Sequence, residues 1–147
     1  HCMRWLGQAQ RAFDLLCERA NARRAFGSTL AEKQMVQEMV FETAAEIQSC
    51  RLLTFDAAHK MDRGEPARVE IGIIKVVGAR MLHNAIDRAI QVYGAKGLTA
   101  DTPLERMYRT ARFGRIYDGP DEVHKATVGR LLLRQYRSGG RVDFGGA

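Results

Sequence analysis

The segment Ile116–His124, with the sequence IYDGPDEVH, sets a carboxylate immediately before a predicted helix start. An ordinary helix start explains most of this segment. Gly119 or Asp118 would be the N-cap, Pro120 would occupy the first turn, and the two acids that follow would complement the helix dipole. The Asp118 carboxylate is the part that this interpretation leaves unused. It can face a cleft and remove a proton there, so Asp118 is the first candidate for chemistry in the chain.

Two predicted helix ends carry a polar side chain shortly before a glycine. Arg23 precedes the break at Phe26-Gly27, and Gln91 precedes the break that begins at Gly94. Glycine C-caps, with a cation matched to the helix dipole, are sufficient to explain both patterns. The alternative is that the guanidinium and the amide face a ligand.

Other kinds of site find no support in the residue spacing. The four histidines lack a second ligand at metal-binding spacing, so we expect no metal site. No serine or cysteine is flanked by residues that would activate it as a nucleophile, and no G-x-x-x-x-G-K motif occurs. The three cysteines lack the spacing of a zinc site or a disulfide framework, which favours a reducing compartment.

The formal net charge of +6 limits the class of partner. Lys and Arg are spread along predicted helices and are not clustered with aromatic residues, which argues against a nucleic-acid partner. A phosphate-rich ligand such as a nucleotide cofactor or coenzyme A fits the charge equally well. No apolar run reaches the length of a membrane span. The chain opens inside a helical pattern with no start signal, so we expect it to be part of a longer protein.

The elements that must position these residues are all predicted to be helices. Apolar residues recur at three- and four-residue steps, Gly and Pro separate the stretches, and no strand signal occurs. One domain of 147 residues is therefore expected to be all-α, an antiparallel up-and-down helical bundle over residues 1–137 with a flexible tail at 138–147. The predicted helices run from the start to about residue 24, over 30–61, over 71–93, over 103–116, and from the opening segment to about residue 136.

Several ordered motifs resemble the C-terminal helical domain of the flavin-dependent acyl-CoA dehydrogenases. The resemblance is collinear from His1 to about Gln135 and so covers nearly all of the chain. The motifs are R-x-x-F-G-x-x-L at Arg23–Leu30, Q-V-x-G-x-x-G at Gln91–Gly97, E-R-x-Y-R-x-A-R at Glu105–Arg112 and I-Y-[acid]-G-x-x-E at Ile116–Glu122. Together they are far more specific than any one of them.

This resemblance implies α,β-dehydrogenation of an acyl-CoA thioester with FAD as cofactor. In the family a carboxylate removes the pro-R α-proton while the β-hydrogen leaves as hydride to flavin N5, and an electron-transferring flavoprotein reoxidises the flavin. Family members assemble as homodimers or homotetramers. Their location would be the cytoplasm in a bacterium, and mitochondria or peroxisomes in a eukaryote. The chain alone is expected to be inactive.

The resemblance also assigns residues. Asp118 falls at the position of the base, and Gly119 lies beside the substrate. The flavin-binding positions fall on Arg23, Gln34, Gln91, Gly94 and Glu122, with Arg23 and Gln34 reaching a flavin that is held mainly by the neighbouring subunit. Pro120 stands where the family usually has Thr, Ala95 replaces a common Gly, and Thr110 replaces an Asp.

The sequence D-G-P-D-E-V-H at residues 118–124 resembles a subgroup with Asp where most relatives have Glu, sometimes fused to kinase-like domains. Asp is one methylene shorter, which retracts the carboxylate by about 1.5 Å at fixed backbone. The subgroup is associated with longer or 4-hydroxylated acyl chains. The alternative functions are a non-catalytic helical interaction or oligomerisation module on the same fold and, below it, nucleic-acid binding.

Overall fold

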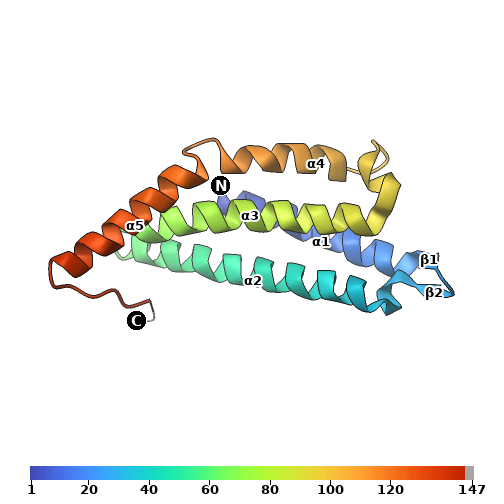
Figure 1. Cartoon of the computed structure of the whole chain (residues 1–147), viewed down its shortest axis with the longest axis horizontal. Coiled ribbons are helices and arrows are strands. Elements are labelled where there is room, and N and C mark those ends of the chain that lie inside the picture. The colour runs from blue at the N-terminus through green and yellow to red at the C-terminus, as the bar shows by residue number, and fades with distance from the viewer. Residues whose placement is uncertain (145–147) are drawn as a thin grey trace.

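Three long antiparallel helices form the body of the molecule (Figure 1). They are α1 (Cys2–Ala22), α2 (Gln34–Asp62) and α3 (Arg68–Tyr93) in the computed structural model, which describes residues 1–144. The apolar stripe of α1 is buried as its spacing predicts, with Trp5, Leu6 and Leu16 almost inaccessible to solvent. Gly64, in the left-handed region at φ 73°, ends α2 as expected. The all-α bundle is thereby confirmed.

The central helix is α3, which contacts each of the other helices. It carries few charges and buries residues on more than one side, as its sequence predicts. Gly78 allows the closest approach of α1, α2 and α3. A Cβ atom at this position would lie 3.1 Å from the Trp5 ring and 3.4 Å from the Cys50 sulfur. The three long helices are therefore packed too tightly for a larger residue at position 78.

The helix predicted over residues 103–116 is shorter than expected. The structure ends α4 (Leu104–Ala111) early and continues with the 3₁₀ turn η3 (Arg112–Arg115). Gly114, within this turn, is buried against Trp5, a contact that the sequence pattern does not show, and its carbonyl accepts a hydrogen bond from Lys75. The sequence Thr102-Pro103-Leu104-Glu105 predicts Thr102 as the N-cap of this helix. The structure instead has Pro103 at the cap, and the Thr102 hydroxyl is buried without a hydrogen-bond partner.

A short hairpin joins α1 to α2, where no strand was predicted. Strand β1 (Arg24–Ala25) pairs with β2 (Ser28–Thr29) in antiparallel register. The turn residues Phe26 and Gly27 have φ values of 52° and 83°, the signs that a type I′ turn requires. Two-residue strands are too short to show an alternating pattern. The predicted Thr29–Glu32 capping box is present, but it caps the 3₁₀ turn η1 (Leu30–Glu32) that precedes α2.

The remaining elements are the 3₁₀ turn η2 (Gly94–Leu98) and α5 (Asp121–Arg137), which leaves the bundle obliquely (Figure 1). Residues 138–144 form no helix or strand, and the Gln135 amide donates to the carbonyl of Arg141. Residues 145–147 of the predicted flexible tail lie outside the described residues. Within the described part no helix is long and apolar enough to cross a membrane.

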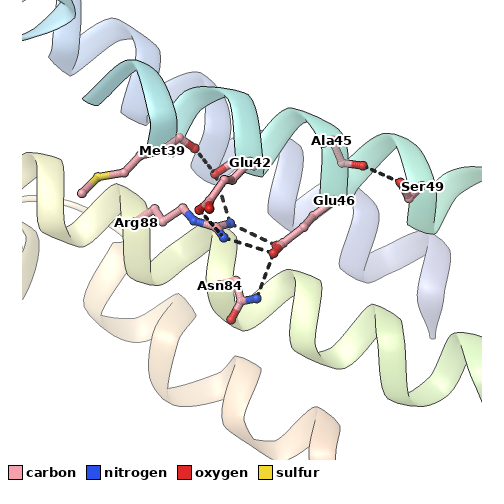
Figure 2. Close-up of polar contacts among 8 residues, drawn as sticks. Met39, Glu42, Ala45, Glu46, Ser49, Asn84 and Arg88 are labelled. Carbon is pink, nitrogen blue, oxygen red and sulfur yellow. Dashed lines mark hydrogen bonds and ion pairs between the residues drawn. The ribbon is translucent and has the colours of Figure 1, made fainter. Parts of the chain in front are cut away.

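A polar network on the partly exposed side of the bundle joins α2 to α3 (Figure 2). The Arg88 guanidinium donates two hydrogen bonds of 3.0 Å to the Glu46 carboxylate and pairs with Glu42 at 2.9 Å. Asn84 donates to the same Glu46 carboxylate at 3.1 Å. Arg88 is mostly buried, so this bidentate contact is stronger than an ordinary surface ion pair.

We therefore expect Arg88→Met to lower the free energy of unfolding by about 2 kcal/mol, because it removes charge-assisted hydrogen bonds between α2 and α3. Urea unfolding measures the change. Arg109→Met is the matched control, because Arg109 pairs with Glu105 within one exposed helix face and should change stability by less than about 0.5 kcal/mol. Equal effects of the two substitutions would contradict a special role for Arg88.

The Cys50 thiol gives a second prediction. Burial raises the pKa of Cys50 from its ordinary 9.0 to about 11, so the folded state favours the protonated thiol. The unfolded chain loses this proton first. The free energy of unfolding should therefore fall as the pH rises between about 9 and 11, by about 2 kcal/mol from this group alone. The test compares urea unfolding of the parent and Cys50→Ala at pH 8 and pH 10.5. The free energy of unfolding should fall less between these two pH values in Cys50→Ala than in the parent. An equal fall in both proteins would contradict the prediction.

Candidate functional site

The loop between η3 and α5 holds the predicted base in an unusual backbone conformation. Asp118 has φ 51° and Gly119 has φ 98°, so two consecutive residues lie in the left-handed region. Pro120, with extended backbone, is the N-cap of α5. The predicted helix start is thus displaced: neither Asp118 nor Gly119 is the cap, and Pro120 lies before the first turn. Proline fits the cap here because its fixed φ matches and its missing N–H is not needed.

Histidines surround Asp118 on two sides. The Asp118 carboxylate pairs with Nε2 of His1 at 2.5 Å, and its side chain is 63% exposed. His124 Nε2 donates to the Asp118 carbonyl at 3.1 Å. A Cβ atom at position 119 would lie 2.7 Å from His124 Nε2, so a larger residue would displace the His124 ring, and the φ of 98° itself favours glycine. This packing fixes the direction in which the loop presents the carboxylate.

An apolar pocket of about 380 Å³ opens beside this carboxylate. Asp118, His1, His124 and Lys75 supply polar side chains to its lining. The second half of α2 and the first half of α3 supply small and aliphatic side chains: Ala57, Ala58, Met61, Ile71 and Ile74. A carboxylate at the rim of an apolar hollow suits proton removal from a substrate whose remaining part is apolar.

An ion pair with a buried carboxylate connects the two ends of the loop. Arg115 Nε donates to Oδ2 of Asp121 at 2.9 Å, and the Asp121 side chain is only 1% exposed. Arg80 of α3 lies 3.8 Å from the same oxygen. The sequence-based interpretation used Asp121 only as a charge for the helix dipole. Its burial shows that it also ties the start of α5 to η3, across the segment that carries Asp118.

Sequence reasoning missed Lys75 and the two histidine contacts. Lys75 is buried beneath the same loop and donates to the Gly114 and Gly119 carbonyls at 2.7 Å and 2.9 Å. A usable signal was present, because Lys75 is the single charge in the apolar run from Ile71 to Ala79. No comparable signal existed for His1, whose partner lies far away in the sequence.

The predicted cofactor residues fall into two separate groups. Arg23, Gln34, Gln91 and Gly94 lie at the hairpin end of the bundle, where α1 ends, α2 begins and α3 ends (Figure 1). The Arg19 guanidinium lies over the Tyr93 ring at 5.3 Å, which shows that the ends of α1 and α3 adjoin. Glu122 instead lies in the first turn of α5, beside Asp118 and Gly119.

These two groups lie apart along α3. Asp118 shares its pocket with Lys75, and Gln91 lies 16 residues further along the helix, which corresponds to about 24 Å. One ligand could contact both groups of one chain only if it were extended over that distance. Two copies packed antiparallel would bring the hairpin end of one chain to the Asp118 end of the other.

The hairpin end has the donors that a dinucleotide needs. Arg23, Gln34 and Gln91 are all exposed there, and they offer a guanidinium and two amides to phosphate oxygens. Phe26, at the tip of the turn, is 97% exposed and presents an aromatic ring to solvent. The donor set therefore fits the phosphates of a dinucleotide, such as the FAD that the family resemblance implies. Within residues 1–144 no group of three His, Cys, Asp or Glu side chains is placed to hold a metal ion.

Comparison with known proteins agrees with this geometry. Residues 1–133 match the family model described as "Acyl-CoA dehydrogenase, C-terminal domain". The chain is 45% identical over 140 residues to "Probable acyl-CoA dehydrogenase FadE2" of Mycobacterium tuberculosis, covering 94% of this chain and 34% of that protein. It therefore spans about a third of the length of this curated relative.

Solved structures show the same arrangement of helices. Butyryl-CoA dehydrogenase from Megasphaera elsdenii superposes with a TM-score of 0.87 at 29% identity, over 90% of this chain and 35% of that one. The FAD complex of PigA superposes with a TM-score of 0.85 at 25% identity, over 88% of this chain and 34% of that one. With a family match over nearly all of its length and this fold, the chain belongs to the acyl-CoA dehydrogenase C-terminal domain family.

Proposed function

We propose that the chain is the flavin- and substrate-binding C-terminal domain of an FAD-dependent acyl-CoA dehydrogenase in which Asp118 removes the α-proton of the thioester. The observation that carries this proposal is the Asp118 carboxylate, held in a left-handed loop at the rim of an apolar pocket. Because the chain spans only about a third of FadE2, the activity would belong to a longer protein.

The chemistry assigned to this chain is proton removal and charge stabilisation. A C–H bond beside a thioester is a weak acid, so its removal needs a positioned carboxylate and a donor for the enolate-like oxygen. Asp118 supplies the carboxylate. Among residues 1–144 the Asp118 N–H donates no backbone hydrogen bond, and in this proposal it donates to the substrate oxygen. Bound FAD would accept the β-hydrogen as hydride.

Cofactor binding is proposed to be shared between two copies of the chain. Arg23, Gln34, Gln91 and Gly94 would contact the FAD whose reactive ring lies at the Asp118 end of the partner copy, with Arg23 on the pyrophosphate. Glu122 would approach the flavin from the copy that supplies Asp118. The separation along α3 supports this division and favours a homodimer or homotetramer. An electron-transferring flavoprotein is the proposed acceptor of the electrons.

The substrate proposed for this site is a longer or 4-hydroxylated acyl-CoA, in line with the D-G-P-D-E-V-H subgroup. The apolar wall formed by α2 and α3 suits an acyl chain. Asp118 reaches less far than Glu by about 1.5 Å, roughly one C–C bond. The loop would compensate by carrying the backbone of Asp118 itself to the rim of the pocket.

The first prediction for this proposal concerns the base. Full-length protein should show a yellow flavin spectrum and exchange the α-proton of an acyl-CoA with solvent deuterium. Asp118→Asn should slow this exchange by about a thousandfold, because the carboxylate is the proton acceptor, while flavin content stays the same. Mass spectrometry of the acyl-CoA measures the exchange.

The matched control is Asp101→Asn, an exposed acid in the loop before α4, which should leave exchange unchanged. Undiminished exchange in Asp118→Asn would move the base to another residue. Colourless protein that FAD does not reconstitute would leave the non-catalytic helical module as the better description.

The second prediction concerns the shared cofactor. Arg23→Ala should weaken FAD binding, because the pyrophosphate loses a bidentate partner. Mixed assembly then separates the two groups of residues. When Arg23→Ala and Asp118→Asn chains are unfolded and refolded together, half of the sites in a mixed dimer combine the intact Arg23 of one chain with the intact Asp118 of the other.

Random mixing should restore dehydrogenase activity to about a quarter of the parent value, although each variant alone is inactive at limiting FAD. The same mixture assembled from separately folded oligomers is the control, and it should remain inactive. No recovery on co-refolding, where the parent protein regains its activity, would show that one chain supplies both groups.

A further inference from the structure

Lys75 is a buried cation on the central helix. Its side chain is 5% exposed, and it lies in the apolar first half of α3, beside the buried Val76 and two turns before Leu82. Burying an ammonium is costly unless hydrogen-bond acceptors replace the lost water. A lysine at this place in the core therefore needs partners that explain its presence.

Those partners lie at both ends of the loop that carries Asp118. Lys75 Nζ donates to the Gly114 carbonyl at 2.7 Å and to the Gly119 carbonyl at 2.9 Å. The rings of Trp5 and Tyr117 flank the ammonium at 5.8 Å and 5.7 Å from their centroids. Trp5 Nε1 donates to the Tyr117 hydroxyl at 3.0 Å, which holds these two rings in place.

This arrangement fixes the backbone on either side of Asp118. Non-glycine residues adopt positive φ at a cost of about 1 kcal/mol or more, and they keep it only where the surroundings enforce it. The Gly119 carbonyl belongs to the Gly119–Pro120 peptide, so the bond from Lys75 fixes the second peptide after the base, while the Asp118 carbonyl itself accepts from His124. The bond to Gly114 fixes the chain four residues before Asp118.

We infer that Lys75 is a positioning residue for the base: its ammonium ties α3 to both ends of the 114–119 segment and keeps Asp118 in the left-handed conformation that presents its carboxylate to the pocket. Lys75 also lines the pocket, but its ammonium is bonded to the two loop carbonyls, so the role assigned to it is positioning. Its effect on the reaction rests on the proposed function of Asp118, whereas its effect on the loop does not.

The test uses Lys75→Met in full-length protein, because Met keeps much of the length and removes the charge. The α-proton exchange rate and kcat, each per bound flavin, should fall about 100-fold, the scale expected for a misplaced reacting group. Flavin content and the Kd for acyl-CoA should change less than about threefold, because the binding surfaces remain. Arg88→Met is the matched control. It also replaces a mostly buried cation of α3, the Arg88 guanidinium, and should leave exchange per flavin unchanged.

Backbone hydrogen–deuterium exchange provides the second readout. In Lys75→Met, amides of residues 114–121 should exchange faster while those of α2 keep their protection. Unchanged α-proton exchange per flavin, or an equal loss of protection throughout the domain, would overturn the inference. If Lys75→Met does not fold, Lys75→Gln is measured in its place and should show the same changes to a smaller extent, because the amide keeps one donor.

The two proposals fail in different ways. If the parent protein binds no flavin and exchanges no α-proton, the proposed function fails, and the amide exchange of residues 114–121 still decides whether Lys75 holds the loop. If the parent is active and Lys75→Met is equally active per flavin, only the inference about Lys75 fails.

Discussion

The burial of α3 is the constraint on which the rest of the structure depends. Every other helix packs against it, and Gly78 lets α1 and α2 approach closely enough to enclose Trp5, Cys2 and Cys50. A helix enclosed in this way has little room for charge. Two of the charges that it carries have definite tasks: Arg88 joins α3 to α2 through Glu46, and Lys75 bonds to the loop that carries Asp118. The position of the candidate base thus follows from the same packing that stabilises the bundle.

The sequence predicted regular elements well and loop geometry poorly. Apolar spacing places α1, α2 and α3 because each buries a continuous stripe, and that stripe is visible in the residues themselves. The early end of α4 was not visible, because the 3₁₀ turn that follows packs Gly114 against Trp5, which is distant in the sequence. The hairpin was missed because strands of two residues carry no periodicity.

For the candidate site, too, the residue was predictable and its geometry was not. Asp118 was identified from its place before a helix, yet its left-handed backbone and its contacts with His1 and His124 arise only when distant segments meet. The fold separates the flavin positions implied by the family resemblance into two groups along α3. This separation is the structural support for the proposal that two copies share one flavin.

The central claim is that Asp118 is held ready to take a proton from a substrate in the adjoining pocket. A crystal structure of the full-length protein with FAD and a non-reactive acyl-CoA analogue tests it most directly. The account predicts an Asp118 carboxylate oxygen within about 3.5 Å of the α-carbon, the distance of a reactive arrangement, with Lys75 still bonded to Gly114 and Gly119. An Asp118 carboxylate turned away from the α-carbon, with another carboxylate in its place, would contradict the account.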